Sequence, residues 1–148
     1  MSSNYYDTNK ARRGLLGHLS FGVPLMSIAE PFYTAIFTPL EITIVYKDQL
    51  SNPKAVGYGW GEREPFCLFE NKDAAPHGKG THLAFNAPTR GAVDKFYEAA
   101  LEHGGKGDGK PGVRKEIHDN YYGCFVYDPF GHRLEAVYQD EPNVESSS

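Results

Sequence analysis

An internal repeat constrains this chain more than any other feature of its sequence. The segment from Gly17 to Phe37 resembles the segment from Thr81 to Leu101, and the two align without a gap at one constant offset. A repeat of this kind indicates two copies of one structural unit. The identical pairs in register are His18 with His82, Leu19 with Leu83, Phe21 with Phe85, Pro24 with Pro88, Phe32 with Phe96, Tyr33 with Tyr97 and Ala35 with Ala99.

Each copy begins with the pattern of a strand. In the first copy, the apolar residues Leu19, Phe21 and Val23 alternate with polar or small residues, and His18 belongs to the second set. Because side chains alternate between the two faces of a strand, one face is apolar and the other carries the imidazole. The second copy repeats this pattern, with His82 at the equivalent position.

A helix is predicted after each of these strands, because apolar residues recur there at helical spacing. Ser27 and Glu30 have the spacing of a capping box at the start of the first helix. The sequence His103-Gly104-Gly105 supplies a stop signal for the second helix. The two helices are expected to cover the apolar strand faces, which leaves both histidines on the opposite faces.

Further strands complete each copy as a βαβββ unit, and the fold class is therefore α+β. We expect a single domain over residues 14–139, with the repeated units at 17–70 and 81–138 and flexible ends at 1–13 and 140–148. Asp128-Pro129-Phe130-Gly131 is a turn signal for the last hairpin. The glycine-rich stretch from Gly104 to Gly112 is predicted to be a loop, and it lacks the Gly-Lys-Ser/Thr ending of a phosphate-binding loop. The predicted further strands cover 41–46, 55–60 and 66–69 in the first unit, and 113–118, 122–127 and 133–138 in the second.

The composition limits the kinds of partner that this chain is expected to bind. The net charge is −4, and the chain has no cluster of Lys and Arg longer than the pair Arg12-Arg13, so no nucleic-acid partner is expected. No apolar run approaches a membrane span, and residues 1–13 are polar where a signal peptide is apolar, so a cytoplasmic protein without a membrane partner is expected. Cys67 and Cys124 lie in apolar strand-like contexts, which predicts buried free thiols.

The two histidines and one carboxylate form a candidate metal site. Glu135 shares a strand face with Arg133 and Val137, and His18 and His82 lie on strand faces away from the helices. Two imidazoles and one carboxylate bind a divalent first-row metal and leave positions open for a substrate. A structural, hydrogen-bonded role for each histidine is the alternative, and the equivalent positions of the two histidines in the repeat favour the metal site.

The repeated strand-helix segments, together with the run from Tyr121 to Val137, resemble the vicinal oxygen chelate superfamily. This superfamily contains glyoxalase I, extradiol dioxygenases, fosfomycin-resistance thiol transferases and bleomycin-binding proteins. The resemblance covers Gly17 to Tyr138 and implies a curved mixed sheet around a central cavity. It also implies His18, His82 and Glu135 as ligands of a divalent ion, which is Fe, Mn, Ni or Zn. Members commonly form homodimers, so His18 of one chain is a candidate partner for His82 and Glu135 of another.

The resemblance departs from glyoxalase I in the fourth strand, where that enzyme supplies a further carboxylate. Here only Glu70, at the end of the strand, is available, since Glu62 and Glu64 precede the strand in a predicted turn. The candidate catalytic residues are Glu70, His118, Tyr121 and Tyr122. The candidate substrate-binding residues are Tyr46, Trp60, Phe66, Phe125 and Tyr127.

The resemblance implies a metal-dependent enzyme for a small substrate that chelates the ion through vicinal oxygens. The reaction is of the lyase or isomerase, thiol transferase or dioxygenase type. One alternative is a metal-free protein that sequesters a small molecule, as bleomycin-resistance proteins do. The other is a structural role in which the histidines bind nothing.

Overall fold

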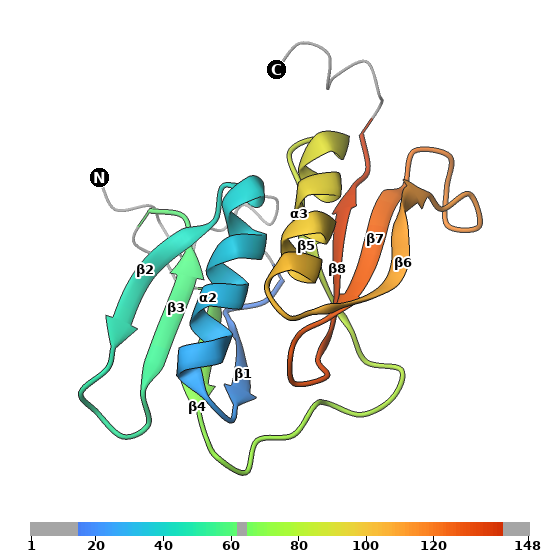
Figure 1. Cartoon of the computed structure of the whole chain (residues 1–148). Helices are drawn as coiled ribbons and strands as arrows, with labels where there is room; N and C mark the ends of the chain where they lie inside the picture. Colours follow the sequence, from blue (N-terminus) through green and yellow to red (C-terminus); the bar gives the residue numbers. More distant parts are fainter. Residues whose placement is uncertain (1–14, 62–64, 141–148) are drawn as a thin grey trace.

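The computed structural model describes residues 15–61 and 65–140, and it confirms two consecutive βαβββ units (Figure 1). Except for Asp140, the predicted flexible ends lie outside the described residues, as do Glu62 and Glu64. The first unit contains β1 (Leu19–Val23), α2 (Met26–Phe37), a short 3-10 helix (Thr38–Leu40), β2 (Thr43–Asp48), β3 (Ala55–Gly59) and β4 (Phe66–Glu70). The second unit contains β5 (Leu83–Asn86), α3 (Arg90–Glu102), β6 (Lys106–Val113), β7 (Tyr122–Tyr127) and β8 (Arg133–Tyr138).

The described strands of each unit form one four-stranded mixed sheet. Sheet A has the order β1-β4-β3-β2, and sheet B has the equivalent order β5-β8-β7-β6. In both sheets the first strand is parallel to the last, and the other neighbours are antiparallel. The repeat seen in the sequence is therefore a repeat of topology, and β1 and β5 are both edge strands.

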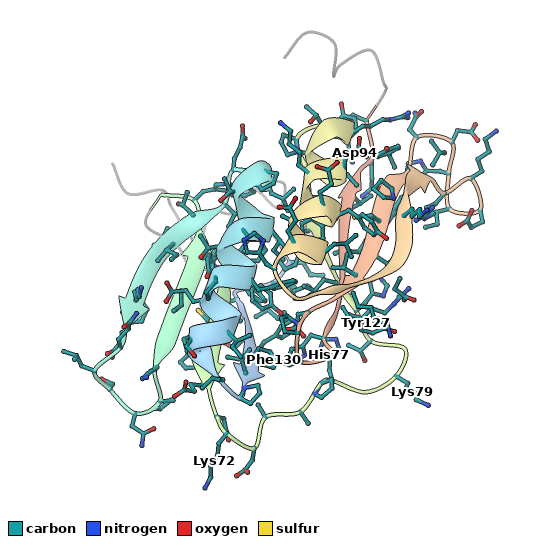
Figure 2. The ribbon with its side chains drawn as sticks, in the orientation of Figure 1. Lys72, His77, Lys79, Asp94, Tyr127 and Phe130 are labelled. Carbon is teal, nitrogen blue, oxygen red and sulfur yellow. The ribbon has the colours of Figure 1, made fainter. Side chains whose placement is uncertain are left out.

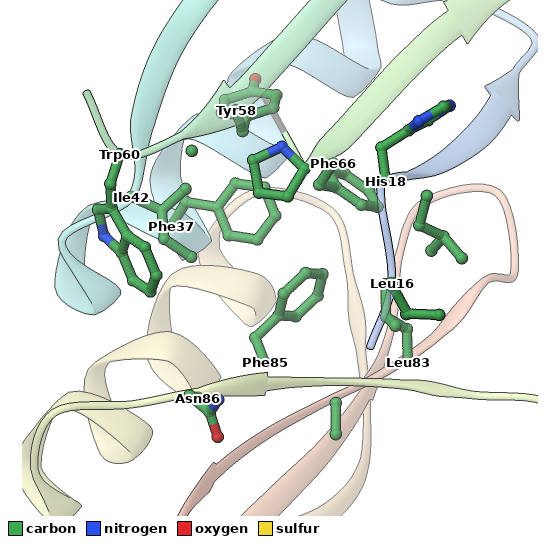
Figure 3. A pocket seen from close by; sticks show the side chains of 14 residues that line it. Leu16, His18, Phe37, Ile42, Tyr58, Trp60, Phe66, Leu83, Phe85 and Asn86 are labelled. Atoms are coloured by element: carbon green, nitrogen blue, oxygen red, sulfur yellow. The ribbon is translucent and has the colours of Figure 1, made fainter. Parts of the chain in front are cut away.

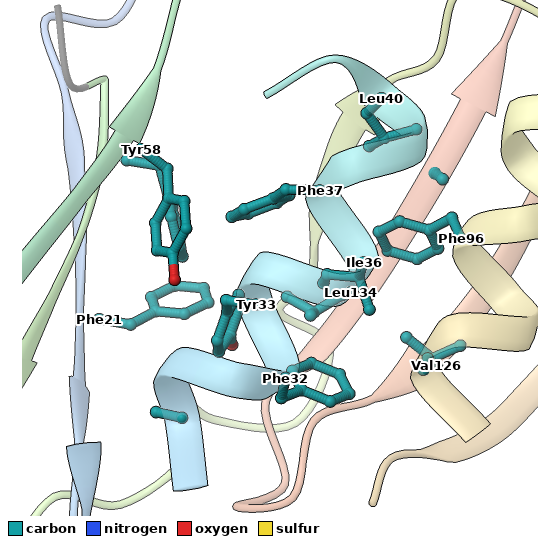
Figure 4. Close-up of a cluster of buried hydrophobic side chains, with 14 of the residues drawn as sticks. Phe21, Phe32, Tyr33, Ile36, Phe37, Leu40, Tyr58, Phe96, Val126 and Leu134 are labelled. Atoms are coloured by element: carbon teal, nitrogen blue, oxygen red, sulfur yellow. The ribbon is translucent and has the colours of Figure 1, made fainter. Parts of the chain in front are cut away.

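The two helices pack against each other between the sheets, and their contact joins the units (Figure 1). Figure 4 shows the resulting core, in which Phe32 and Phe37 of α2 lie near Phe96 of α3 and Leu134 of β8. All four side chains are fully buried. One face of each sheet is covered by its helix, and we call the other face the open face.

The N-terminus of α2 corrects the predicted capping box. The N-cap residue is Leu25, which makes no side-chain hydrogen bond, so Ser27 and Glu30 do not form the box. The Met26 amide instead donates to a carboxylate oxygen of Glu70 at 2.8 Å. An acceptor from the end of β4 thus takes the place of a local cap, and a cap so distant along the chain leaves no local sequence signal.

The glycine-rich segment of the second unit corrects the predicted loop and strand. The strand β6 covers Lys106–Val113, and the residues that follow it, where a strand was predicted, form a turn closed by hydrogen bonds to the carbonyl of Arg114. Glycine is needed here for space, because a Cβ on Gly107 would overlap the Tyr97 hydroxyl and one on Gly109 would lie 3.2 Å from the Phe125 ring. Close packing, and not chain flexibility, therefore explains these glycines.

Other local predictions are confirmed. Helix α3 ends at Glu102, and the Gly105 amide donates to the Ala100 carbonyl at 2.8 Å while Gly104 has a φ of 93°. The turn before β8 closes as predicted, with a hydrogen bond from the Gly131 amide to the Asp128 carbonyl. Both cysteines are buried and form no disulfide.

No helix in the described part of the chain is long and apolar enough to cross a membrane.

Candidate functional site

A histidine and a glutamate meet on the open face of sheet B. His82 lies directly before β5, and Glu135 lies in the middle of β8, whose neighbours Leu134 and Ala136 point into the core on the helix side. The His82 Nε2 atom is 2.9 Å from a carboxylate oxygen of Glu135. The Glu135 side chain is 2% exposed and that of His82 is 36% exposed. The Glu135 carboxylate is therefore buried, while part of the His82 imidazole is exposed to solvent.

Tyr121 fixes the second carboxylate oxygen of Glu135. Its hydroxyl donates a very short hydrogen bond to that oxygen. Burial, followed by the hydrogen bond to Glu135 and the charge of that carboxylate, raises the pKa of Tyr121 well above its usual value. The tyrosine therefore stays protonated as a donor, and both oxygens of Glu135 have partners within the chain.

Phe125 forms the apolar wall beside this pair. Its ring is edge-on to the His82 ring, with the centroids 5.5 Å apart. The guanidinium of Arg133 lies 4.3 Å from the Phe125 centroid, and that of Arg114 lies 5.8 Å from it. The site therefore combines one buried carboxylate with an aromatic ring and two cations, an arrangement that suits a polar or anionic ligand.

The chemistry of the His82 and Glu135 donors fits a divalent first-row metal. Their separation of 2.9 Å is close to the spacing of about 3 Å between adjacent ligands that each lie about 2.1 Å from an ion. The Tyr121 hydrogen bond supplies the outer support that ligating carboxylates commonly have. Among residues 15–61 and 65–140, however, no group of three or more His, Cys, Asp and Glu side chains is placed to hold an ion.

His18 lies apart from this pair within one chain. It is exposed, it precedes β1 at the edge of sheet A, and it lines the apolar pocket between the units together with Leu83 and Phe85 of β5. Figure 3 shows its imidazole directed away from Phe85 and Asn86 of β5. The structure therefore brings together two of the three predicted ligands, His82 and Glu135.

Two of the four candidate catalytic residues lie near the His82–Glu135 pair. Tyr121 contacts Glu135, and the exposed His118 ring is edge-on to Tyr121 at 5.4 Å. Tyr122 lies on the helix side of sheet B, where its hydroxyl donates to the Asp94 carboxylate of α3 at 2.7 Å. Glu70 caps α2 in the other unit. Both Tyr122 and Glu70 therefore have structural partners away from the pair.

The candidate substrate-binding residues lie in three places. Phe125 and Tyr127 are on the open face of sheet B, since they pair with Glu135 and Arg133. Tyr46 is half exposed on the open face of sheet A. Trp60 and Phe66 line an apolar pocket of about 210 Å³ between the units (Figure 3).

A second pair of histidines, which the sequence did not single out, joins the two units. His132 is 3% exposed, its Nε2 atom is 3.0 Å from the Gly22 carbonyl of β1, and its ring stacks on Phe21 at 4.5 Å. Its Nδ1 atom lies 3.4 Å from Nδ1 of His77. Burial and then the nearby His132 lower the pKa of His77. Both histidines lie outside the repeated strand position, so the repeat gave no signal for them.

The hairpin that carries His132 is anchored by a buried carboxylate. One oxygen of Asp128 accepts the amides of Phe130 and His132 at 2.8 Å, and the other accepts the Tyr33 hydroxyl of α2 at 2.6 Å. Burial, and then the charge of Asp128, raises the pKa of Tyr33 well above its usual value. Through Asp128, the turn before β8 is therefore hydrogen-bonded to α2 of the first unit, and it connects the two units.

The comparison with known protein structures agrees with this fold. A glyoxalase/bleomycin resistance protein from Albidiferax ferrireducens T118 is 25% identical, with a TM-score of 0.70 over 84% of this chain and 98% of that one. The fosfomycin resistance protein FosX from Listeria monocytogenes is 17% identical, with a TM-score of 0.61 over 84% of this chain and 92% of that one. A glyoxalase/bleomycin resistance protein/dioxygenase family enzyme from Burkholderia phytofirmans PsJN is 14% identical, with a TM-score of 0.63 over 84% of this chain and 98% of that one.

No curated protein matches the sequence significantly. A family model, in contrast, matches residues 53–136, which is more than half of the chain and includes both His82 and Glu135. The family match and the repeated βαβββ topology agree with the resemblance noted in the sequence. The chain belongs to the Glyoxalase/Bleomycin resistance protein/Dioxygenase superfamily.

Proposed function

We propose that this protein is a divalent-metal-dependent enzyme that acts on a small substrate with two neighbouring oxygen atoms. The observation that carries the proposal is the His82–Glu135 pair, a buried carboxylate and a solvent-reaching imidazole 2.9 Å apart on the open face of sheet B. The proposed ligands are His82, Glu135 and His18. The reaction is of the lyase or isomerase, thiol transferase or dioxygenase type.

The third ligand is proposed to come from a second copy of the chain. His18 is exposed at the edge strand of sheet A, and within the described part of one chain it forms no group of three such side chains with His82 and Glu135. A homodimer that brings the open face of sheet A against the open face of sheet B of the partner would unite the three side chains. Two equivalent sites would then form, one at each junction of the dimer.

The residues around the pair have distinct roles in this proposal. A bound ion would act as a Lewis acid and stabilise negative charge on a coordinated oxygen. Tyr121 holds the Glu135 carboxylate in place through its short hydrogen bond. Phe125 excludes water from one side of the His82 ring. Glu135 is a ligand and not a free base, so the exposed His118 beside Tyr121 is the candidate for proton transfer.

Metal content tests this proposal. The purified protein is incubated with Fe, Mn, Ni or Zn and analysed for bound metal, beside His18→Ala, His82→Ala and Glu135→Ala variants. The control is His103→Gln, which changes an exposed histidine at the end of α3. About one ion per chain is expected in the wild type and the control, and loss of the ion is expected in the three variants. No stoichiometric metal under any of the four conditions contradicts the proposal.

A mixture of two inactive variants tests the shared site. A heterodimer of a His18→Ala chain and a His82→Ala chain would contain one junction with no lesion, because the intact His18 of the second chain faces the intact His82 and Glu135 of the first. Mixing is therefore expected to restore metal binding at one of the two sites. If His18 acted within its own chain, mixing would restore nothing.

The identity of the metal would then rank the reactions. Iron favours oxygenation, nickel or zinc favours isomerisation of the glyoxalase type, and manganese favours thiol transfer.

The apolar pocket beside Trp60 favours a second function, the metal-free binding of an apolar small molecule. Retention of such a molecule by a protein that binds none of the four metals would support this second function.

A further inference from the structure

A cavity of about 570 Å³ lies against sheet B, and residues close in sequence to His82 and Glu135 contribute to its lining. Its lining includes Lys79 and Thr81 from the segment before β5, Asp108 from β6, Tyr127 from β7 and Arg133 from β8. Figure 2 shows Lys79 and Tyr127 at the same end of the second unit. The cavity therefore draws its lining from the chain segments that also carry the candidate ligands.

The cavity continues the candidate site along β8. Thr81 directly precedes His82, and Arg133 lies two residues before Glu135 on the same face of β8. Two residues of a strand span about 6.6 Å. The Arg133 guanidinium also stacks on Phe125, the ring that contacts His82. A ligand bound at the pair can therefore reach Arg133 without leaving the open face.

The charge of this cavity favours an anion. Arg133 and Lys79 supply two cations, and Asp108 supplies one carboxylate, which pairs with Nε of Arg133 at 2.8 Å. That ion pair occupies Nε, so the terminal guanidinium nitrogens keep donors for a second acceptor. Lys79 is exposed and forms no ion pair with another residue of the described ranges.

We propose that the substrate carries an oxyanion, a carboxylate or a phosphate-type group, which binds Arg133 and Lys79 in this cavity. This inference rests on the proposed function, because it places the oxyanion about two strand residues from the oxygens that chelate the metal. Arg133 acts as the directional donor, since its planar fork matches the oxygens of such a group. Lys79 adds a second positive charge, and Asp108 positions Arg133.

A matched pair of catechols tests the charge requirement. The probes are 3,4-dihydroxybenzoate and its neutral counterpart 3,4-dihydroxybenzamide. Both carry the two neighbouring oxygens, and they differ only in the charge of the group on the opposite side of the ring. Titration calorimetry of the metal-loaded protein is expected to show about tenfold tighter binding of the benzoate, the gain typical of a charge-assisted hydrogen bond. Equal affinities for the two probes would overturn the inference.

Variants with opposite effects sharpen this test. Arg133→Gln and Lys79→Gln are expected to reduce the preference for the benzoate, and Asp108→Asn is expected to increase it, because the substitution releases Arg133 from its ion pair. The control is Lys72→Gln, an exposed lysine that lines a different cavity. No increase in Asp108→Asn, or the same loss in the Lys72 control, would also overturn the inference.

A measurement without metal separates this inference from the proposed function. Inorganic phosphate is titrated into the metal-free protein, and the amide NMR signals of Gly78, Gly80 and Thr81 are followed. Saturable shifts that weaken in Arg133→Gln are expected. If these shifts occur but neither catechol binds the metal-loaded protein, the metal proposal fails and the anion site stands. If both catechols bind equally and phosphate causes no shift, the anion site fails and the metal proposal stands.

Discussion

Replacing Glu70 tests whether this residue is a helix cap or a member of the catalytic site. The Glu70 carboxylate accepts the amide of Met26, the first residue of α2, across 44 positions of the sequence. It connects β4 to the start of the helix that joins the two units. We expect Glu70→Ala to destabilise the protein and to leave metal binding at His82 and Glu135 unchanged.

The magnitude follows from the two parts of this contact. Loss of a capping acceptor costs about 0.5–2 kcal/mol, and loss of a negative charge at a helix N-terminus costs about 0.3–1 kcal/mol. The expected loss of unfolding free energy is therefore about 1–2 kcal/mol for Glu70→Ala. Glu70→Gln keeps an acceptor and loses only the charge, so about 0.5 kcal/mol is expected.

Urea denaturation followed by circular dichroism measures both variants, and Glu102→Ala at the far end of α3 serves as the control. A shift of the urea midpoint at constant m-value would show a change of stability alone. The corresponding change in melting temperature is about 2–4 °C per kcal/mol for a chain of this length. A change below about 0.3 kcal/mol in Glu70→Ala, or a loss of metal binding in Glu70→Gln, would refute the capping role.

Four further predictions concern the candidate site and the junction of the units. Tyr121→Phe should stay folded and bind Ni or Zn about 10–100-fold more weakly by calorimetry, because Glu135 loses its outer support, and unchanged affinity would contradict this. His132→Ala should lower the unfolding free energy by about 3 kcal/mol in urea, since it removes a buried ring and a hydrogen bond between the units, and a loss below about 1 kcal/mol would argue against the junction. The pKa of His77 is lower in the folded chain than in the unfolded chain, so the unfolded chain binds a proton at higher pH. The free energy of unfolding is therefore unaffected by this histidine above about pH 6.5 and decreases as the pH drops below that value. His77→Gln should reduce this pH dependence of stability, measured as urea midpoints between pH 5 and 7.5. Burial raises the pKa of Cys124 to about 12, so N-ethylmaleimide at pH 8 should label it only after unfolding, and rapid labelling of the native protein would contradict its burial.

Much of the fold was predictable because the repeat and the strand alternation are local signals. The predicted strands at 122–127 and 133–138 match β7 and β8, and the alternation in β8 places Glu135 opposite the core residues Leu134 and Ala136. The errors arose where long-range contacts decide local structure. The glycines of β6 make room for Tyr97 and Phe125, and the cap of α2 comes from Glu70. Neither contact can be read from neighbouring residues.

The candidate site was predictable only in part. The alternation in a strand predicts which residues share a face of the sheet, but it does not predict how that face is placed relative to the other sheet. The alternation assigned His18 and Glu135 to the faces opposite the helices, and for Glu135 in sheet B this holds. The packing of α2 against α3 then sets how the two sheets are placed, and no local pattern predicts that packing. His82 and Glu135 still meet, because β5 and β8 are neighbours in one sheet, whereas His18 belongs to the other. We propose that a second chain completes a three-ligand site that uses all of these side chains, and the mixture of His18 and His82 variants tests the assembly and the chemistry together.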